Sequence, residues 1–250
     1  SQAFSSSDES ALDLRGFGCV VAFGKDETLA QIRAACSPDA RFIGYGSRAS
    51  AGYVSEKAAR DSKDLARLLE GAARDVVLYD SEGCMSLHVL FAEGESAQQI
   101  ARDLSSAIED ACHRFPIGKR DASTALQVAA VRSSAAFRQT LNSGVVFSDR
   151  AHTFAVTVAS SDEPPPFAPR CLTVVPVRHP SEAVDYLERH GIALEAFALS
   201  ESHADLIEMG IRAGAVRLTR FGELQKPPVV GNHGGRGRIT DFIRWIDREL

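Results

Sequence analysis

The chain has 250 residues, of which 44% are hydrophobic and 24% are charged, proportions typical of a globular protein. Its formal net charge of −5 argues against a nucleic-acid-binding protein, which would need a basic face. No apolar run reaches the roughly 20 residues that a membrane helix needs. Residues 1–10 are polar and lack the features of a signal peptide, so we expect a cytoplasmic protein without a membrane span.

The cysteines are odd in number and widely spaced: Cys19, Cys36, Cys84, Cys112 and Cys171. This pattern is typical of reduced thiols rather than of a disulfide framework. The sequence has no CxxC or HExxH motif, and a single Cys–His pair supplies too few ligands for zinc. We therefore predict no metal site.

In chain order, residues 1–16 are rich in serine and acidic residues and predict a flexible lead-in. Residues 19–23 predict a short strand that ends at Gly24, and a helical pattern follows until Pro38. A strand, a glycine and a helix N-terminus can present backbone N–H groups to a phosphate. An ordinary turn with Asp26 as the N-cap explains the same residues equally well.

A second strand is predicted at residues 41–43, and it runs into Gly44 and Gly46, which allow another group to approach the backbone closely. Residues 55–74 predict a helix whose first residue, a serine, is a good N-cap. Residues 75–79 are ambiguous, because their β-branched side chains favour a strand while no helix breaker precedes them.

The rest of the chain alternates helices and strands. The predicted strands lie at residues 88–92, 153–158, 171–175, 194–199 and 215–218, and the predicted helices at 96–114, 121–141, 180–190, 203–213 and 239–250. Ser202 is the expected N-cap of one helix and Gly214 the cap at its end. This alternation predicts an α/β fold with a mainly parallel sheet. The Gly/Arg-rich segment 231–238 fits a phosphate-binding nest or, more simply, a solvated connector.

The candidate chemistry lies in the segment Gly83–Cys84 and, four residues later, His88. Positions i and i+4 share one side of a helix and also of a strand, so Cys84 and His88 are expected to face each other. A neighbouring imidazolium stabilises a thiolate, which is the nucleophilic form of cysteine. We therefore expect Cys84 to be the thiol most sensitive to alkylation, although a buried inert cysteine beside a structural histidine fits the same local sequence.

Several segments resemble the C-terminal part of the acyl-CoA reductases of the bioluminescence (Lux-type) fatty-acid reductase family, within the aldehyde dehydrogenase superfamily. They are VVAFGKDET at 20–28, RFIGYG at 41–46, DSEGCMSLH at 80–88 and ITDFIRW at 239–245, with weaker similarity at 196–199 and 213–216. The resemblance implies a three-layer αβα catalytic domain with a mainly parallel sheet and a remnant of the dinucleotide-binding domain. It also implies a helix at residues 75–80, leading into the nucleophile.

On this resemblance we expect four parts: a flexible lead-in at 1–16, the remnant of the nicotinamide-cofactor domain at 17–54, the catalytic domain at 55–222, and a loop and helix at 223–250. Members of the family carry a further N-terminal region with most of the dinucleotide-binding sheet and an oxyanion-stabilising Asn. The chain begins after that region, so we expect it to bind the cofactor poorly by itself.

The resemblance also assigns roles to residues. Cys84 matches the nucleophile, and the turn of Gly24, Lys25 and Thr28 matches a segment near the cofactor pyrophosphate. The segment from Gly44 to Gly46 falls where hydrolytic aldehyde dehydrogenases carry a Glu that activates water. The absence of a carboxylate there suits an enzyme whose acyl-enzyme must not be hydrolysed.

The implied function is reduction of a long-chain acyl-CoA or another acyl thioester to the aldehyde, through a Cys84 acyl-enzyme and hydride from NADPH or NADH. In this scheme His88 activates the thiolate or delivers a proton, and a purely structural role for His88 is the alternative. The implied partners are the acyl thioester, a second copy of the chain or an acyl-transferring protein. Two other functions stay open: a catalytically incomplete fragment or interaction module with this fold, and a cysteine acyltransferase or hydrolase that needs no nicotinamide.

Overall fold

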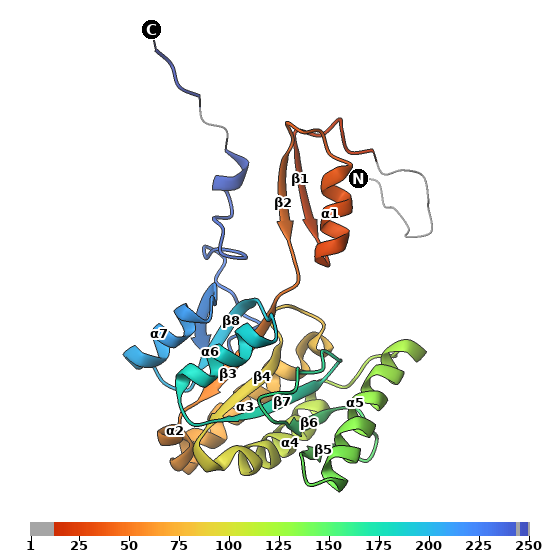
Figure 1. Ribbon diagram of the computed structural model, residues 1–250, viewed down its shortest axis with the longest axis vertical. Coiled ribbons are helices and arrows are strands. Elements are labelled where there is room, and N and C mark those ends of the chain that lie inside the picture. Colours follow the sequence, from red (N-terminus) through yellow and green to blue (C-terminus); the bar gives the residue numbers. More distant parts are fainter. Residues whose placement is uncertain (1–12, 244–245, 250) are drawn as a thin grey trace. The chain divides into compact units, whose positions relative to one another are not determined.

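The structure, a computed structural model, describes residues 13–243 and 246–249. The chain divides into two compact units (Figure 1), the smaller made of residues 1–47 with 230–250 and the larger of residues 48–229. In 13–243 and 246–249, no helix is both long and apolar enough to cross a membrane.

The smaller unit is built on two parallel strands, β1 (Cys19–Phe23) and β2 (Arg41–Tyr45), with helix α1 (Asp26–Ala34) packed against both. These three elements confirm the sequence prediction. The N-cap of α1 is Lys25 rather than the expected Asp26, and no side chain caps this end. The rings of Phe23, Tyr45 and His233 stack on one another, with centroids 4.7 and 4.5 Å apart, so the segment after residue 230 belongs to this unit.

The predicted C-terminal helix at residues 239–250 is wrong where the structure describes the chain. A single 3₁₀ turn, η3 (Thr240–Phe242), stands there, and residues 246–249 have no regular structure. Residues 244, 245 and 250 lie outside the described part. The apolar side chains that suggested an amphipathic helix include Phe242 and Ile246, and both are exposed.

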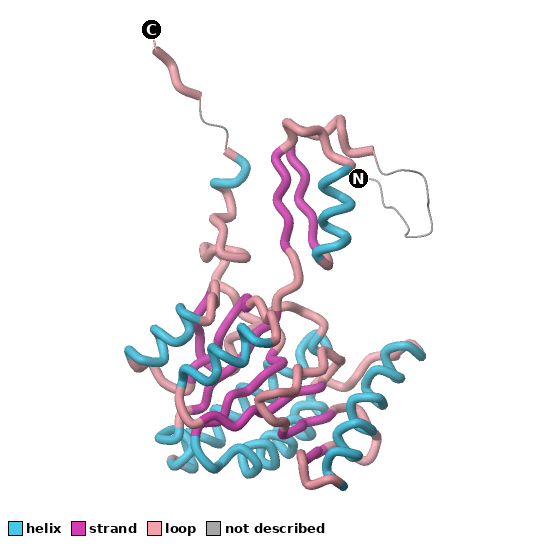
Figure 2. The backbone as a smooth tube through the Cα atoms, in the orientation of Figure 1, coloured by secondary structure: helices cyan, strands magenta, loops and turns pink. Residues whose placement is uncertain are grey.

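The larger unit contains a seven-stranded sheet in the order β5-β6-β7-β4-β3-β8-β9 (Figure 2). The strands are β3 (Ala49–Val54), β4 (Leu87–Glu93), β5 (Val145–Phe147), β6 (Ala155–Val158), β7 (Cys171–Val177), β8 (Leu194–Leu199) and β9 (Arg217–Arg220). Strands β5 and β6 are antiparallel, and all the other neighbouring strands run parallel. The predicted mainly parallel sheet is therefore confirmed.

Helices cover both faces of this sheet. They are α2 (Glu56–Arg60), α3 (Ser62–Val77), α4 (Ala97–Arg114), α5 (Ala122–Thr140), α6 (Pro180–Arg189) and α7 (Ala204–Arg212). One buried apolar cluster joins α3 and α4 to the sheet, and a second joins α6 and α7 to it, while α5 packs against β5 and β6. The predicted three-layer αβα arrangement is confirmed.

Some local predictions differ from the structure. The central strand β3 and the edge strand β5 were not predicted. The larger unit begins at residue 48 and so includes β3, whose residues had been expected to belong to the remnant at 17–54. Residues 75–77 are helical, as the resemblance implied, and a 3₁₀ segment, η1 (Leu78–Ser81), follows. The N-cap of α7 is His203 rather than Ser202, whereas Gly214 has the expected positive φ of 72° beyond the helix end.

A buried carboxyl group ties α3 to the segment that follows β9. Asp75 lies on α3, and its Oδ2 accepts a hydrogen bond of 2.5 Å from the backbone N–H of Gly222. Burial raises the pKa of Asp75 to about 7, although nearby backbone N–H groups and Arg74 oppose this rise. Below about pH 7 Asp75 therefore keeps its proton in the folded protein, while its Oδ2 holds Gly222 against the helix.

Replacing Asp75 by Asn should remove this pH dependence. The folded pKa of about 7 exceeds the ordinary value of 3.8, so between these values the folded state keeps a proton that the unfolded state releases. As the pH rises through this range, the free energy of unfolding of the wild type should fall relative to that of Asp75→Asn, by up to about 1.4 kcal/mol per pH unit. Urea unfolding of both proteins at about pH 5 and pH 7 measures the effect. A difference between them that does not vary with pH would contradict the assignment.

Candidate functional site

Cys84 lies on a turn between η1 and β4, at the edge of the sheet where the parallel strands β3, β4 and β8 begin. The turn is closed by a 2.9 Å hydrogen bond from the N–H of Ser86 to the carbonyl of Gly83. Two side chains from other elements fix it. Ser50 on β3 donates to the carbonyl of Cys84 at 2.8 Å, and Gln225 donates to the hydroxyl of Ser86 at 2.8 Å.

The thiol of Cys84 is half-buried, and opposing influences act on it. Burial, and then the negative charge of Glu195, raise its pKa above the ordinary value. The backbone N–H groups of Cys84 and Met85, together with the charge of Arg48, act in the opposite direction. The free protein therefore holds Cys84 mainly as a thiol at neutral pH, with two backbone donors in place for a negative charge.

His88 is the second residue of β4 and is buried against Phe167, whose ring centroid lies 5.3 Å from its own in an edge-to-face arrangement. Burial lowers the pKa of His88 to about 4, and the carbonyl of Gly83 only partly offsets this. The imidazole is therefore neutral at pH 7. Its Nδ1 is buried and has no hydrogen-bond partner within the part of the chain that the structure describes.

Two expectations about Cys84 and His88 need correction. The argument that they face each other assumed one continuous helix or strand, but a turn holds Cys84 and β4 begins only at Leu87. A neutral His88 also lacks the charge that would stabilise a thiolate. The expectation that Cys84 alkylates first loses its basis as well, because its pKa is raised while Cys19 is exposed.

The residues expected near a cofactor, Gly24, Lys25, Thr28, Gly44 and Gly46, all belong to the smaller unit. The N–H of Gly24 donates to Tyr45 at 3.2 Å, which continues the pairing of β1 with β2. Packing inside this unit explains the other two glycines. A Cβ at Gly44 would come within 3.3 Å of Leu29, and one at Gly46 would clash with the carboxylate of Asp26.

These residues do not fit a complete dinucleotide site by themselves. The first turn of α1 carries Asp26 and Glu27, whose negative charges would repel a pyrophosphate at this helix end. The carboxylate of Asp26 instead accepts a hydrogen bond from the N–H of Ser47 at 3.3 Å. Two strands and one helix are also less than the αβ units on which such cofactors normally lie.

Several residues around Cys84 were missed by the sequence prediction. Glu195 on β8 is buried and lies 3.8 Å from the guanidinium of Arg48, and Ser50 joins Cys84 to the N–H of Ala196. Glu195 carried a usable signal, because a charged residue inside the apolar run 194–199 is unusual for a buried strand. Arg48 and Ser50 carried none, since Arg48 precedes and Ser50 belongs to a strand, β3, that the sequence did not indicate.

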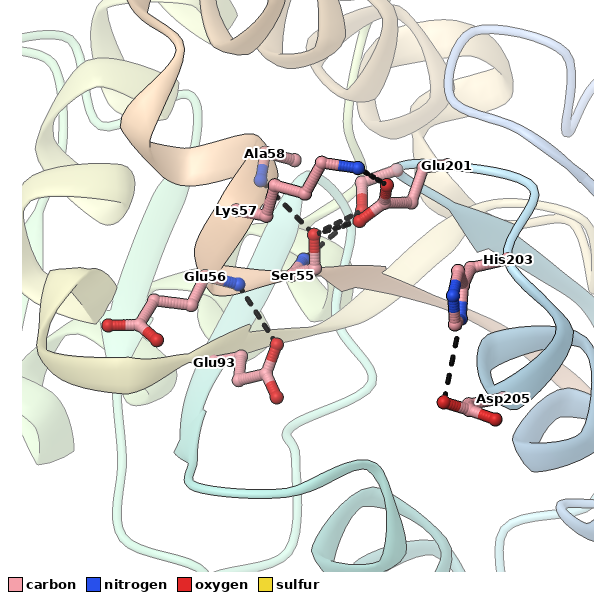
Figure 3. A network of polar contacts seen from close by, with 9 residues as sticks. Ser55, Glu56, Lys57, Ala58, Glu93, Glu201, His203 and Asp205 are labelled. Atoms are coloured by element: carbon pink, nitrogen blue, oxygen red, sulfur yellow. Dashed lines mark hydrogen bonds and ion pairs between the residues drawn. The ribbon is translucent and has the colours of Figure 1, made fainter.

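The opposite edge of the sheet, where β3, β8 and β9 end, contains a cavity of about 1020 Å³ lined by parts of α2, α3, α7 and β9. Polar side chains at this edge bind one another (Figure 3). Ser55, the predicted N-cap of the helix that follows β3, accepts from the N–H of Ala58 at 3.1 Å and donates to Glu201 at 2.7 Å. Lys57 contacts the same carboxylate at 2.8 Å, and none of the predicted site residues lies in this network.

Over residues 13–243 and 246–249, no group of three or more His, Cys, Asp or Glu side chains is arranged to hold a metal ion. All five cysteines are free. The chemical groups identified at the Cys84 site are the thiol, two backbone N–H donors, the neutral imidazole of His88 and the Glu195–Arg48 pair.

Solved structures with this architecture are aldehyde dehydrogenases and related enzymes. Bifunctional proline utilization A is 15% identical, with a TM-score of 0.64, over 87% of this chain and 24% of that chain. A gamma-glutamyl-gamma-aminobutyraldehyde dehydrogenase from Burkholderia cenocepacia is 16% identical (TM-score 0.62; 82% and 44% of the two chains). An indole-3-acetaldehyde dehydrogenase in complex with NAD⁺ is 14% identical (TM-score 0.61; 81% and 44%).

The chain thus spans less than half the length of these structures, and at such identities the likeness establishes the fold. A search of the curated proteins gave no match to the sequence. The model of the family described as acyl-CoA reductase (LuxC) matches residues 11–245, which is most of the chain. The chain therefore belongs to the LuxC acyl-CoA reductase family and has the fold of the aldehyde dehydrogenase superfamily.

Proposed function

We propose that this chain carries the thioester-binding half of an acyl-CoA reductase, with Cys84 as the residue that receives the acyl group. The observation that supports this most directly is the position of the Cys84 thiol, on a fixed turn beside the backbone N–H groups of Cys84 and Met85. Donors of this kind stabilise both a thiolate and the oxyanion that forms when a thioester is attacked. Membership of the family supports the choice of an acyl thioester as substrate.

In the proposed step, the sulfur of Cys84 attacks the thioester carbonyl while its proton passes to a base. The C–S bond to CoA then breaks, the CoA sulfur takes that proton back from the base, and CoA leaves as the thiol. The raised pKa of Cys84 means that the thiol must lose its proton as substrate binds, so the free protein is protected from unspecific reaction. In the complete reaction, reduced nicotinamide (NADPH or NADH) would supply the hydride that converts the acyl-enzyme to the aldehyde.

Glu195 is the candidate base for the proton transfer, and His88 is a second polar group of the site. Glu195 is buried close enough to the thiol for its charge to raise the pKa of Cys84. His88 contributes instead as a neutral hydrogen-bonding group, because its Nδ1 has no partner among the described residues and its pKa of about 4 makes it a weak base.

A cysteine acyltransferase without nicotinamide is the second candidate function. The acidic first turn of α1 and the filled surroundings of Gly44 and Gly46 favour it, since the described residues of the smaller unit form no complete dinucleotide site. Both functions share the acyl-enzyme and differ in what removes the acyl group. A reductase releases an aldehyde, whereas a transferase passes the acyl group to another nucleophile.

Incubation with a long-chain acyl-CoA should increase the mass of the protein by one acyl group. The adduct should disappear on treatment with hydroxylamine, which cleaves thioesters, and should be absent in Cys84→Ala. Cys19→Ala is the matched control, because it removes an exposed thiol that has no proposed role. An adduct that persists in Cys84→Ala, or a folded wild-type protein that forms none, would contradict the proposal.

Replacing His88 by Gln should leave the pH dependence of acylation unchanged near neutral pH, because no charge is removed there. The free energy of unfolding should instead differ in its pH dependence between the wild type and His88→Gln under acidic conditions. The folded pKa of about 4 lies below the ordinary 6.5, so His88 contributes stability above pH 6.5 that is lost as the pH falls toward 4. Acylation rates across pH 6 to 9 and urea unfolding across pH 4 to 7 test the two parts. A shift of the acylation profile in His88→Gln would show instead that His88 is charged at the site.

NADPH should bind this chain only weakly. Contacts at a helix N-terminus contribute roughly 0.3–1 kcal/mol each, while a micromolar Kd needs about 8 kcal/mol. The carboxylates of Asp26 and Glu27 oppose the phosphates further. Calorimetric titration of the chain with NADPH measures the affinity, and Asp26→Asn is the control that should strengthen it slightly. A tight one-site isotherm for the wild type would show that the cofactor site is more complete than we infer.

A further inference from the structure

The three residues that lead into the nucleophile turn have a backbone conformation that side chains rarely adopt. Tyr79, Asp80 and Ser81 have φ angles of 55°, 53° and 59°, in the left-handed region that normally favours glycine. None of them is a glycine, and Tyr79 is exposed. Such a run is unfavourable by itself and persists only where the surrounding structure holds it in place.

A buried arginine provides this hold. The Nε of Arg170 lies 2.6 Å from Oδ1 of Asp80, and the side chain of Arg170 is 3% exposed. Its other two nitrogens are also engaged, one by the sulfur of Cys112 at 3.1 Å and one by the carbonyl of Phe115 at 2.9 Å. With all three nitrogens bound, the guanidinium is fixed by α4 and the segment after it, and it fixes Asp80 in turn.

Further contacts carry this hold to Cys84. The hydroxyl of Ser81 donates to the carbonyl of Val76 at 2.6 Å, and the N–H of Glu82 donates to the carbonyl of Tyr79 at 3.0 Å. On the other side, Ser50 holds the carbonyl of Cys84. The turn at residues 83–86 is therefore held from two sides. On one side are the left-handed residues 79–81, which Arg170 contacts through Asp80, and on the other is the start of the sheet at Ser50.

We propose that the Asp80–Arg170 pair is a positioning device for Cys84. It keeps residues 79–81 left-handed, and this conformation sets the direction in which the Cys84 thiol and the N–H groups around it point. The inference rests on the proposed role of Cys84. If the pair were lost, residues 79–81 would relax toward ordinary right-handed conformations, and the thiol would move relative to Ser50 and β4.

Arg170 itself has a φ of 52° and directly precedes β7. Both partners of this partly buried ion pair therefore have a left-handed backbone, with the side chain of Asp80 30% exposed. Arg120 lies close enough for its pKa to respond to both Asp80 and Arg170, but its guanidinium donates to the carbonyl of Thr153 at 3.0 Å. Arg170 is therefore the arginine that pairs with Asp80, while Arg120 is hydrogen-bonded to the carbonyl of Thr153.

The test compares Arg170→Met and Asp80→Asn with the control Arg178→Met, which breaks an exposed ion pair with Glu182 on the same unit. Two rates are followed by peptide mass spectrometry: acylation of Cys84 by a long-chain acyl-CoA, and alkylation of Cys84 by iodoacetamide between about pH 7 and pH 10. Thermal unfolding is recorded for each variant, and rates are measured well below its midpoint. Asp80→Asn keeps the shape of the side chain, so it decides the question if Arg170→Met does not fold.

We expect Arg170→Met and Asp80→Asn to slow acylation about tenfold or more and to shift the pH profile of alkylation, while Arg178→Met changes neither. The double variant Asp80→Gly/Arg170→Met should regain part of the lost rate, because glycine adopts the left-handed conformation without steric cost. A purely structural pair would lower the unfolding midpoint and leave both Cys84 rates unchanged, which would overturn the inference.

The two proposals fail in different ways. If the wild type forms no acyl adduct but Arg170→Met still alters the alkylation profile of Cys84, the positioning role stands and the proposed function is wrong. If the wild type is acylated and the rates of the folded Arg170 and Asp80 variants equal the wild-type rates, the proposed function stands and the positioning role is wrong.

Discussion

The larger unit depends on one constraint, the burial of β3 between β4 and β8. All six residues of this strand are buried, and it pairs in parallel on both sides. Its small side chains are required by what lies above it, because a Cβ at Gly52 would clash with the ring of Phe221 and lie 3.2 Å from Leu90. The strand also carries Ser50, which joins the Cys84 turn to β8. The position of Cys84 is thus tied to the packing of the central strand.

Around Cys84 the protein favours an unreactive resting state. Burial and Glu195 raise the pKa of the thiol, and burial also keeps His88 neutral. The backbone donors near the sulfur become useful only when negative charge develops on the sulfur or on the substrate oxygen. Under the proposed function, Cys84 would therefore lose its proton when the substrate binds, because in the free protein burial and Glu195 outweigh the groups that stabilise its thiolate.

The two ends of the parallel strands serve different purposes. Ligands of open parallel sheets usually bind where the strands end, and a cavity lined largely by charged and hydroxyl side chains lies at that edge here. Cys84, the proposed nucleophile, lies instead where β4 begins. A loop there can be fixed by strands on either side and by helices above, as Ser50, Gln225 and Arg170 fix the segment from Tyr79 to Ser86. Rigid placement of one thiol is easier to achieve in such a surrounded turn.

The sequence by itself determined the α/β class and the mainly parallel sheet, because apolar periodicity depends on neighbouring residues alone. Cys84 became the candidate nucleophile through the resemblance of whole segments to a family, since the local sequence fits an inert cysteine equally well. The sequence missed β3, whose first four residues, Ala, Ser, Ala and Gly, have little strand preference, and only the tertiary structure shows that the ring of Phe221 excludes a side chain at Gly52. It predicted a C-terminal helix from an apolar pattern, but Phe242 and Ile246 are exposed and Thr240–Phe242 form only a 3₁₀ turn. The charge of His88, the pKa of Cys84 and the Asp80–Arg170 contact were decided by tertiary structure, because burial and partners 90 residues apart in the chain set them.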